Sequence, residues 1–141
     1  FELFMTEYDP RRGLKGADCF HCHGGAFFTD HRFHNNGLRD DEDRGLESVT
    51  GRPTDRNRFI TPSLRNIALT APYMHDGRFQ TLEAVIKHYD SGLHRSSTLD
   101  PNLAKHPPEG LGLGKEDRTA LVAFLKTLTD PQFLPTAKTG N

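Results

Sequence analysis

Apolar residues recur at helical spacing in two segments of the second half of the chain. In the first, which starts at Thr81 and is expected to stop at Gly92, the i, i+3, i+4, i+7 pattern gives one buried face made of Leu82, Val85, Ile86 and Tyr89. The second is predicted over about residues 115–128, and its core-facing stripe consists of Leu121, Phe124, Leu125 and Leu128. Two amphipathic helices are therefore predicted.

Two further helical segments are predicted from shorter patterns. Thr61 is a candidate N-cap, Pro62 suits the first helical position, and Pro72 would end a helix whose apolar residues are Leu64, Ile67 and Ala68. Near the N-terminus, a helical turn is expected before Pro10, formed by the apolar cluster Phe1, Leu3, Phe4 and Tyr8.

Two long segments lack periodicity and are interpreted as loops. Residues 24–59 are rich in Gly, Asn and Asp, and a loop of that length in a compact domain usually wraps a ligand or serves a site. Residues 91–114 form the second loop, in which His94 and His106 are expected to be solvated. With helices separated by loops, and neither a strand pattern nor a repeat, the sequence predicts an all-α fold in one domain, residues 1–141.

The composition supplies little material for a core. Only 34% of the 141 residues are hydrophobic, Trp is absent, and there are 13 Gly and 9 Pro, so a large apolar cofactor is expected to fill the centre. A net charge of −1 without a basic stripe argues against nucleic acid as a partner. No apolar run approaches the roughly 20 residues that span a bilayer. Because the chain begins without Met and without a signal-peptide pattern, we expect a mature or trimmed piece from which a targeting segment or upstream domain was removed.

Both cysteines belong to one short motif. The run Cys19-Phe20-His21-Cys22-His23 is C-x-x-C-H, the attachment signature of c-type haem. Two residues between the thiols, on one helical turn, let both sulfurs reach the same porphyrin edge while His23 turns beneath the ring to ligate iron. The sequence therefore predicts one covalent haem c, enclosed by a cytochrome-c-like helical domain with long loops.

Three other interpretations of the cysteines are weaker. A zinc finger has about twelve residues between its second Cys and its first His, and three to five residues between its two His. The gaps here are eight and two residues for the candidate ligands Cys19, Cys22, His31 and His34. A redox dithiol would more naturally accompany a βαβ pattern, which this chain lacks. A disulfide that closes so short a loop would stabilise the fold little.

Longer motifs show a resemblance to a known family. The segments "CFHCHGG", "FITPSLRNIALTAPYMHDGRFQTLEAVIKHYDSG" and "LVAFLKTLTDPQF" resemble the C-terminal haem domain of bacterial di-haem cytochrome c peroxidases and MauG-like proteins. The resemblance covers most of residues 13–134, and its most specific part is "TPSLRNIALTAPYMHDG".

The resemblance implies a periplasmic two-haem oxidoreductase. In such an enzyme an N-terminal haem domain reacts with peroxide, the C-terminal haem passes or stores electrons, and a small redox protein is the electron partner. This chain has a single C-x-x-C-H motif. The second haem domain is therefore expected upstream or on a separate chain, and the alternative is a stand-alone mono-haem electron carrier.

Two residues compete for the sixth coordination position of the iron. From the residues alone Met74 is favoured, because a soft thioether suits an electron-transfer haem and Met5 lies too near the attachment motif. The resemblance instead places Tyr89 where peroxidase relatives carry their Met ligand and MauG-like relatives carry a Tyr ligand. Tyr89 is therefore preferred and Met74 is the alternative. Without a ligand role, Tyr89 would be a core aromatic residue and Met74 a gap filler.

The resemblance also suggests roles for four other residues. His75 is expected to face the neighbouring haem domain and to shape the inter-haem region, or else to be a turn histidine bonded to Asp76. Arg65 could pair with a haem propionate or form a surface salt bridge. The carbonyls of Thr70 and Pro72 correspond to calcium ligands in peroxidase relatives.

The charged stretch 39–58 is expected to be solvated, with docking of the redox partner as the alternative.

Overall fold

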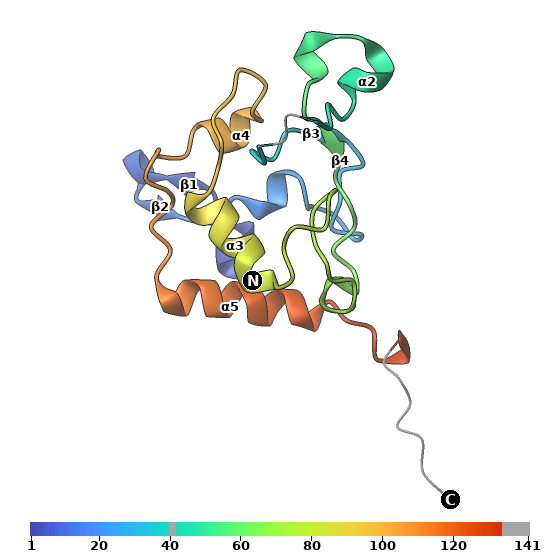
Figure 1. Ribbon diagram of the computed structural model, residues 1–141. Coiled ribbons are helices and arrows are strands. Elements are labelled where there is room, and N and C mark those ends of the chain that lie inside the picture. The colour runs from blue at the N-terminus through green and yellow to red at the C-terminus, as the bar shows by residue number, and fades with distance from the viewer. Residues whose placement is uncertain (40–41, 134–141) are drawn as a thin grey trace, which may run out of the picture.

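Two helices form the base of the molecule in the computed structural model, which describes residues 1–39 and 42–133 (Figure 1). Helix α3 (Leu82–Ser91) packs on α5 (Lys115–Thr127), so both predicted amphipathic helices are confirmed. The side chain of Thr81 caps α3 by accepting a hydrogen bond from the Ala84 N–H at 3.2 Å. At the start of α5, the carboxylate of Asp117 accepts from the Gly114 N–H at 3.0 Å.

Aromatic rings dominate the core between α5 and the N-terminal segment. Phe4, on α1 (Glu2–Met5), and Leu121, on α5, are each only 1% exposed. The Phe4 ring lies 5.0 Å from Phe124 and 6.0 Å from Phe28, measured between centroids. The predicted N-terminal helical turn is therefore confirmed, although it ends at Thr6 rather than at Pro10.

The prediction of an all-α, cytochrome-c-like fold is wrong, because the described residues contain two small antiparallel sheets beside five α-helices. Strand β1 (Tyr8–Asp9) pairs with β2 (Leu14–Lys15), and β3 (Phe33–His34) pairs with β4 (Phe59–Ile60). Each strand has only two residues, which is too short for alternating polarity to appear in the sequence. The protein is a small domain of mixed structure.

The helix predicted from Thr61 to Pro72 is also wrong, since only the 3-10 turn η4 (Ile67–Leu69) forms there. Thr61 instead extends the pairing of β4: its N–H donates to the Arg32 carbonyl at 2.8 Å, and its carbonyl accepts from the Thr29 hydroxyl at 2.7 Å. Asn66 then adopts a left-handed conformation (φ 60°), which no α-helix tolerates.

The two predicted loops contain short helices. Residues 24–59 include α2 (Glu47–Thr50) and η3 (Pro53–Asp55), and α4 (Pro101–Ala104) lies within residues 91–114. The remaining 3-10 turns are η1 (Pro10–Arg12), η2 (Cys19–His21) and η5 (Pro131–Phe133).

Most residues of the charged stretch 39–58 are exposed or half-buried, and residues 40 and 41 lie outside the described part. Helix α2 and the β3–β4 sheet lie at the opposite end of the molecule from α5 (Figure 1).

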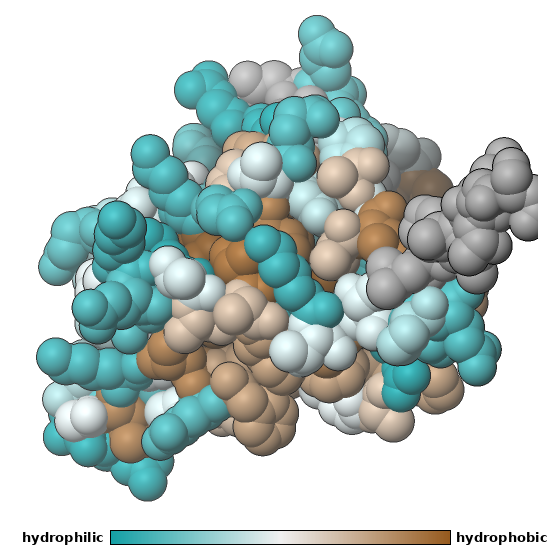
Figure 2. Space-filling model, turned by 90° about the horizontal axis from the view of Figure 1, so that it is seen from below, coloured by the Kyte–Doolittle hydropathy of each residue, from teal (hydrophilic) through white to brown (hydrophobic). Residues whose placement is uncertain are grey.

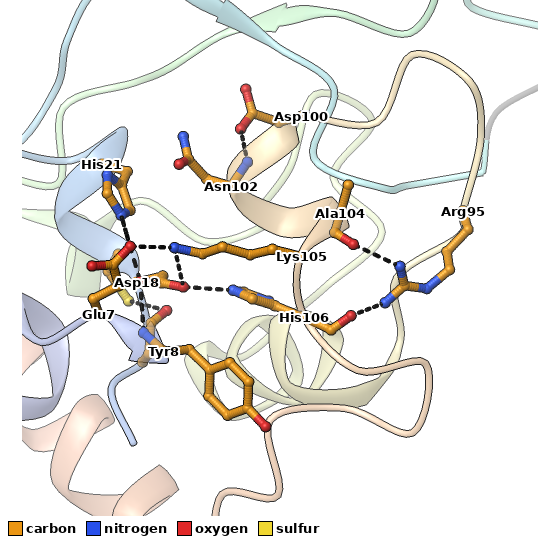
Figure 3. A network of polar contacts seen from close by, with 12 residues as sticks. Glu7, Tyr8, Asp18, His21, Arg95, Asp100, Asn102, Ala104, Lys105 and His106 are labelled. Atoms are coloured by element: carbon orange, nitrogen blue, oxygen red, sulfur yellow. Dashed lines mark hydrogen bonds and ion pairs between the residues drawn. The ribbon is translucent and has the colours of Figure 1, made fainter. Parts of the chain in front are cut away.

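Asp18 joins the N-terminal strands to the segment that follows α4 (Figure 3). Its carboxylate accepts hydrogen bonds from the Tyr8 N–H at 2.9 Å and the His106 Nε2 at 2.8 Å, and lies 3.2 Å from the Lys105 ammonium. Lys105 also binds Glu7 at 2.8 Å. His106 is 3% exposed, so the expectation that it is solvated is wrong. We call Glu7, Asp18, Lys105 and His106 the Asp18 cluster.

The face that carries α5 is a mosaic of apolar and hydrophilic side chains (Figure 2). Among its exposed apolar residues, Phe1 is 68% exposed and packs its ring 5.4 Å from that of Phe124 on α5. Isolated exposed apolar residues are ordinary on protein surfaces. Within residues 1–39 and 42–133, no helix combines the length and the apolarity that crossing a bilayer requires.

Substitution of Asp18 by Asn should destabilise the fold. Burial alone would raise the pKa of Asp18, but the bonds from His106, Tyr8 and Lys105 outweigh burial and lower it. Removing the charge weakens the acceptor of the buried His106 Nε2 and takes from Lys105 one of its two carboxylate partners, so the free energy of unfolding should fall by about 2 kcal/mol at neutral pH. Chemical denaturation of the purified protein measures this loss.

The pH dependence gives a second signature of the same substitution. Because the folded-state pKa of Asp18 lies below its ordinary value of 3.8, its contribution is complete above that value and is lost as pH falls through the folded-state pKa. Glu83→Gln is the control, since its contact with Lys126 is 3.9 Å long and exposed and should change stability by less than about 0.5 kcal/mol. Equal stability losses for the two variants would contradict the role of Asp18.

Candidate functional site

Cys19 begins the turn η2, directly after Asp18, and Cys22 is the C-cap of that turn; neither cysteine is in a disulfide. Burial raises the pKa of Cys19 to about 12, with a further contribution from the charge of Asp18. Burial likewise raises the pKa of Cys22 to about 12, with contributions from Asp100 and Asp30. A redox dithiol depends on a lowered thiol pKa, so these protonated thiols argue against that interpretation.

His23 is held as a neutral imidazole with a defined tautomer. Its Nδ1 donates a hydrogen bond to the Phe28 carbonyl at 3.0 Å, and the Pro62 carbonyl also interacts with the ring. Burial lowers the pKa of His23, despite the opposing effect of these carbonyls. With the proton on Nδ1, the lone pair lies on Nε2, which is the usual arrangement of a histidine that ligates a metal.

Tyr89, near the C-terminal end of α3, points toward the cysteines. Burial raises the pKa of its phenol to about 12, and the charges of Cys22 and Cys19 raise it further, while the side chain of Asn36 acts in the opposite direction. By residue exposure Tyr89 is half-buried. Its role as an iron ligand stays a prediction.

Met74 is half-buried on the turn that follows η4. Its sulfur accepts a hydrogen bond from the Asn36 Nδ2 at 3.5 Å, and its backbone is left-handed, with φ 74°. The other methionine, Met5, is 43% exposed on α1.

These residues fit a covalently attached haem. Two half-buried thiols are separated by two residues, an imidazole with a lowered pKa follows them, and the phenol of Tyr89 on α3 is under the electrostatic influence of both cysteines. Porphyrin attachment requires two sulfurs on one edge and an imidazole beneath the ring, and the order of these residues supplies both. The large apolar ring would also add to a core that is poor in apolar side chains.

The zinc interpretation finds no support in the structure. In the part of the chain that the structure describes, the one group of three potential ligands with converging donor atoms is Glu7, Asp18 and His21. The negative charge of its carboxylates is already compensated by the ammonium of Lys105, which lies 2.8 Å from Glu7. His31 is exposed and does not converge with the cysteines.

His34 forms a polar group that the sequence analysis missed. Its Nδ1 lies 2.6 Å from an oxygen of Asp100, and its Nε2 lies 2.7 Å from an oxygen of Asp30. Burial alone would lower the pKa of His34, but the two carboxylates outweigh burial and raise it. The Asp30 N–H donates to the Cys22 carbonyl at 2.9 Å, so this triad holds the segment after the motif. Only the i, i+4 spacing of Asp30 and His34 was visible in the sequence.

His75 and Arg65 lie at the surface. The His75 ring is exposed and stacks on Phe59, with centroids 3.6 Å apart and planes 9° from parallel. Arg65 donates through Nε to the Ala26 carbonyl at 3.0 Å, and its guanidinium lies over the Phe27 ring at 5.6 Å. Arg65 therefore supports the turn that follows the cysteine motif.

Thr70 and Pro72 are exposed between η4 and the turn at Met74. The Thr70 hydroxyl donates to the Ile67 carbonyl at 3.1 Å, and the Tyr73 hydroxyl donates to the same carbonyl at the same distance. These bonds fix the turn that presents the Thr70 and Pro72 carbonyls. Their role as calcium ligands stays a prediction.

Curated relatives of the chain are haem proteins. The methylamine utilization protein MauG of Methylorubrum extorquens is 40% identical over 126 residues, which cover 85% of this chain and 34% of the relative. Cytochrome c551 peroxidase of Nitrosomonas europaea is 34% identical over 135 residues, which cover 92% of this chain and 36% of the relative. No family model matches the chain.

Solved structures show the same fold. The crystal structure of a MauG-like protein associated with microbial copper homeostasis matches 92% of this chain and 42% of its own, at 36% identity and a TM-score of 0.72. The diheme peroxidase BthA of Burkholderia thailandensis matches 92% of this chain and 44% of its own, at 24% identity and a TM-score of 0.68.

The chain spans about a third of the length of these curated relatives, and this partial coverage agrees with the predicted correspondence to one haem domain of a longer protein. The relatives are at least 30% identical over most of the chain. The chain belongs to the family of the MauG proteins and the bacterial di-haem cytochrome c peroxidases.

Proposed function

We propose that this chain is the electron-transferring haem c domain of a di-haem peroxidase or MauG-like oxidase. The observation that carries the proposal is the half-buried pair Cys19 and Cys22, both outside any disulfide and with raised pKa values, followed directly by the imidazole of His23, whose pKa is lowered. In this arrangement each thiol adds its S–H across a porphyrin vinyl group, and each forms one thioether bond. Haem c, when bound, supplies one-electron chemistry at its iron.

His23 and Tyr89 are the proposed axial ligands. The Phe28 carbonyl keeps the proton of His23 on Nδ1 and so presents Nε2 to the metal. The effect of both cysteines on the pKa of Tyr89 supports this choice. Burial raises that pKa to about 12, so an iron held by this residue would have to displace the proton of its phenol. A phenolate ligand lowers the reduction potential relative to Met.

The remaining assignments concern the rest of the assembly. A second haem domain, upstream or on a separate chain, reduces peroxide, and a small periplasmic redox protein delivers electrons. His75, exposed and stacked on Phe59, is the proposed contributor to the inter-haem region. Arg65 is proposed to pair with a haem propionate, and the exposed carbonyls of Thr70 and Pro72 to ligate calcium between the domains.

A stand-alone mono-haem electron carrier is the second candidate. The single C-x-x-C-H motif favours it, because one motif attaches one haem. Native mass and pyridine haemochrome analysis of the intact assembly separates the two candidates. Two haems per assembly support the di-haem enzyme, and one haem supports the carrier.

Removal of the thiols should abolish covalent haem attachment. In Cys19→Ala/Cys22→Ala both thioether bonds are lost, so any remaining haem should pass into acidified butanone, whereas each single variant should retain haem through one bond. His21→Gln is the matched control, because His21 lies inside the motif but is neither a thiol nor the proposed ligand, and it should retain haem fully. Covalent haem in the double variant would exclude attachment at this motif.

The two candidate sixth ligands should respond differently to substitution. Tyr89→Phe removes the phenolate donor, so the midpoint potential should rise by on the order of 100 mV and the ferric spectrum should change. Met74→Leu should leave both unchanged. Spectroelectrochemical titration measures both quantities. A parent-like Tyr89→Phe variant, together with loss of a Met-to-iron charge-transfer band in Met74→Leu, would make Met74 the ligand instead.

A further inference from the structure

A groove of about 410 Å³ lies between helix α3 and the loop that follows β3. One wall is formed by residues 37–39 of that loop, and α3 lines the groove with Ala84, Lys87, His88 and Ser91. Since these four residues are spaced i, i+3, i+4 and i+7, they lie on one face of the helix. The volume is within the range of clefts that bind small molecules in proteins.

Three hydrogen bonds hold the loop wall of the groove in place. The carbonyls of residues 36, 37 and 39 accept, in that order, from the His88 Nε2 at 2.9 Å, the His94 N–H at 2.8 Å and the Arg78 Nη1 at 3.1 Å. The three donors lie on α3, on the segment after it and on the segment before it. Because the wall is already fixed at three points, few groups have to be ordered when a ligand enters, which favours binding.

Positive charge gathers along this groove. Its charged lining residues are Arg39, Arg78 and Lys87, and among the lining residues that the structure describes there is no carboxylate. The guanidinium of Arg78 is held by Asp76, which lies outside the lining and accepts from its Nε at 2.5 Å. Lys87 is exposed and forms no ion pair within residues 1–39 and 42–133. The ammonium of Lys87 is therefore available to pair with an anionic ligand.

Apolar side chains also line the groove. Leu38 is buried, Phe79 is half-buried, and the Phe79 ring packs against His88 with centroids 5.6 Å apart. Ala84, one helical turn before Lys87, has a side chain too small to fill the space beside it. A small inorganic anion would leave this apolar surface unused, whereas a ring with an attached carboxylate contacts both the apolar residues and the cations.

We propose that this groove is a binding site for a small organic anion, a carboxylate on a flat apolar body. The ammonium of Lys87 pairs with the carboxylate, the fixed charge of Arg78 adds to the attraction, and the apolar body packs on Phe79 and Ala84. The site goes beyond the proposed function, because its lining residues do not include the cysteine motif and it does not depend on haem attachment.

The test is calorimetric titration of the full-length protein with benzoate at low ionic strength, with the neutral benzamide as the matched ligand. Benzoate should bind, and benzamide should bind about tenfold more weakly because it lacks the charge. Lys87→Gln should weaken benzoate binding about fivefold, the effect of one exposed ion pair, and leave benzamide binding unchanged. Lys126→Gln, the same change on α5, should bind benzoate like the parent. Ala84→Leu fills the groove and should abolish binding of both ligands.

Three results would each overturn this site. The first is a parent protein that does not bind benzoate, which includes the case in which a propionate of an attached haem fills the groove. The second is equal affinity of the parent for benzoate and benzamide. The third is the same benzoate affinity in Lys87→Gln and Lys126→Gln. If Ala84→Leu fails to fold, as judged by circular dichroism, the exposed Lys87→Gln decides alone. Failure of the proposed function is visible separately, as a parent without covalent haem, and leaves the titration valid.

Discussion

The carboxylate of Asp18 holds three separate parts of the chain beside the turn that carries both cysteines. It binds the Tyr8 N–H on β1, precedes Cys19 directly, and accepts from His106, which is 88 residues away in the sequence. The same charge that anchors this turn also keeps the neighbouring thiol protonated, since both burial and Asp18 raise the pKa of Cys19. Asp18 therefore contributes both to the placement of the cysteine turn and to the raised pKa of Cys19, of which burial is the larger cause.

A second set of bonds fixes the segment on the C-terminal side of the motif. The Phe28 carbonyl sets the tautomer of His23, and the Asp30–His34–Asp100 triad joins the backbone at Cys22 to β3 and to the start of α4. The candidate site is thus assembled from short elements with long-range polar contacts.

Parts of this structure could be predicted from the sequence because they depend on local patterns. Helices α3 and α5 followed from apolar periodicity, and Leu82 and Ile86 of the predicted face of α3 are buried. The cysteine motif pointed to haem because its chemistry depends on spacing alone. In each case the information lies within about ten residues of sequence.

The errors arose where distant residues decide the outcome. Thr61 has the residue type of an N-cap, but it pairs with Arg32 and Thr29 and so continues a strand. His106 lies in a polar segment, yet it is buried and its Nε2 hydrogen-bonds to Asp18. Two-residue strands leave no periodic signal, so the all-α prediction could not anticipate them. The hydrogen bond from Asn36 to the Met74 sulfur likewise joins segments that the sequence does not relate.

The most direct test of the account is peptide mapping of the native protein by mass spectrometry. The account predicts that the proteolytic peptide that contains Cys19 and Cys22 carries the added mass of one haem, with neither thiol open to alkylation. A peptide of unmodified mass, whose two cysteines are both alkylated, would contradict the central claim that this motif attaches haem.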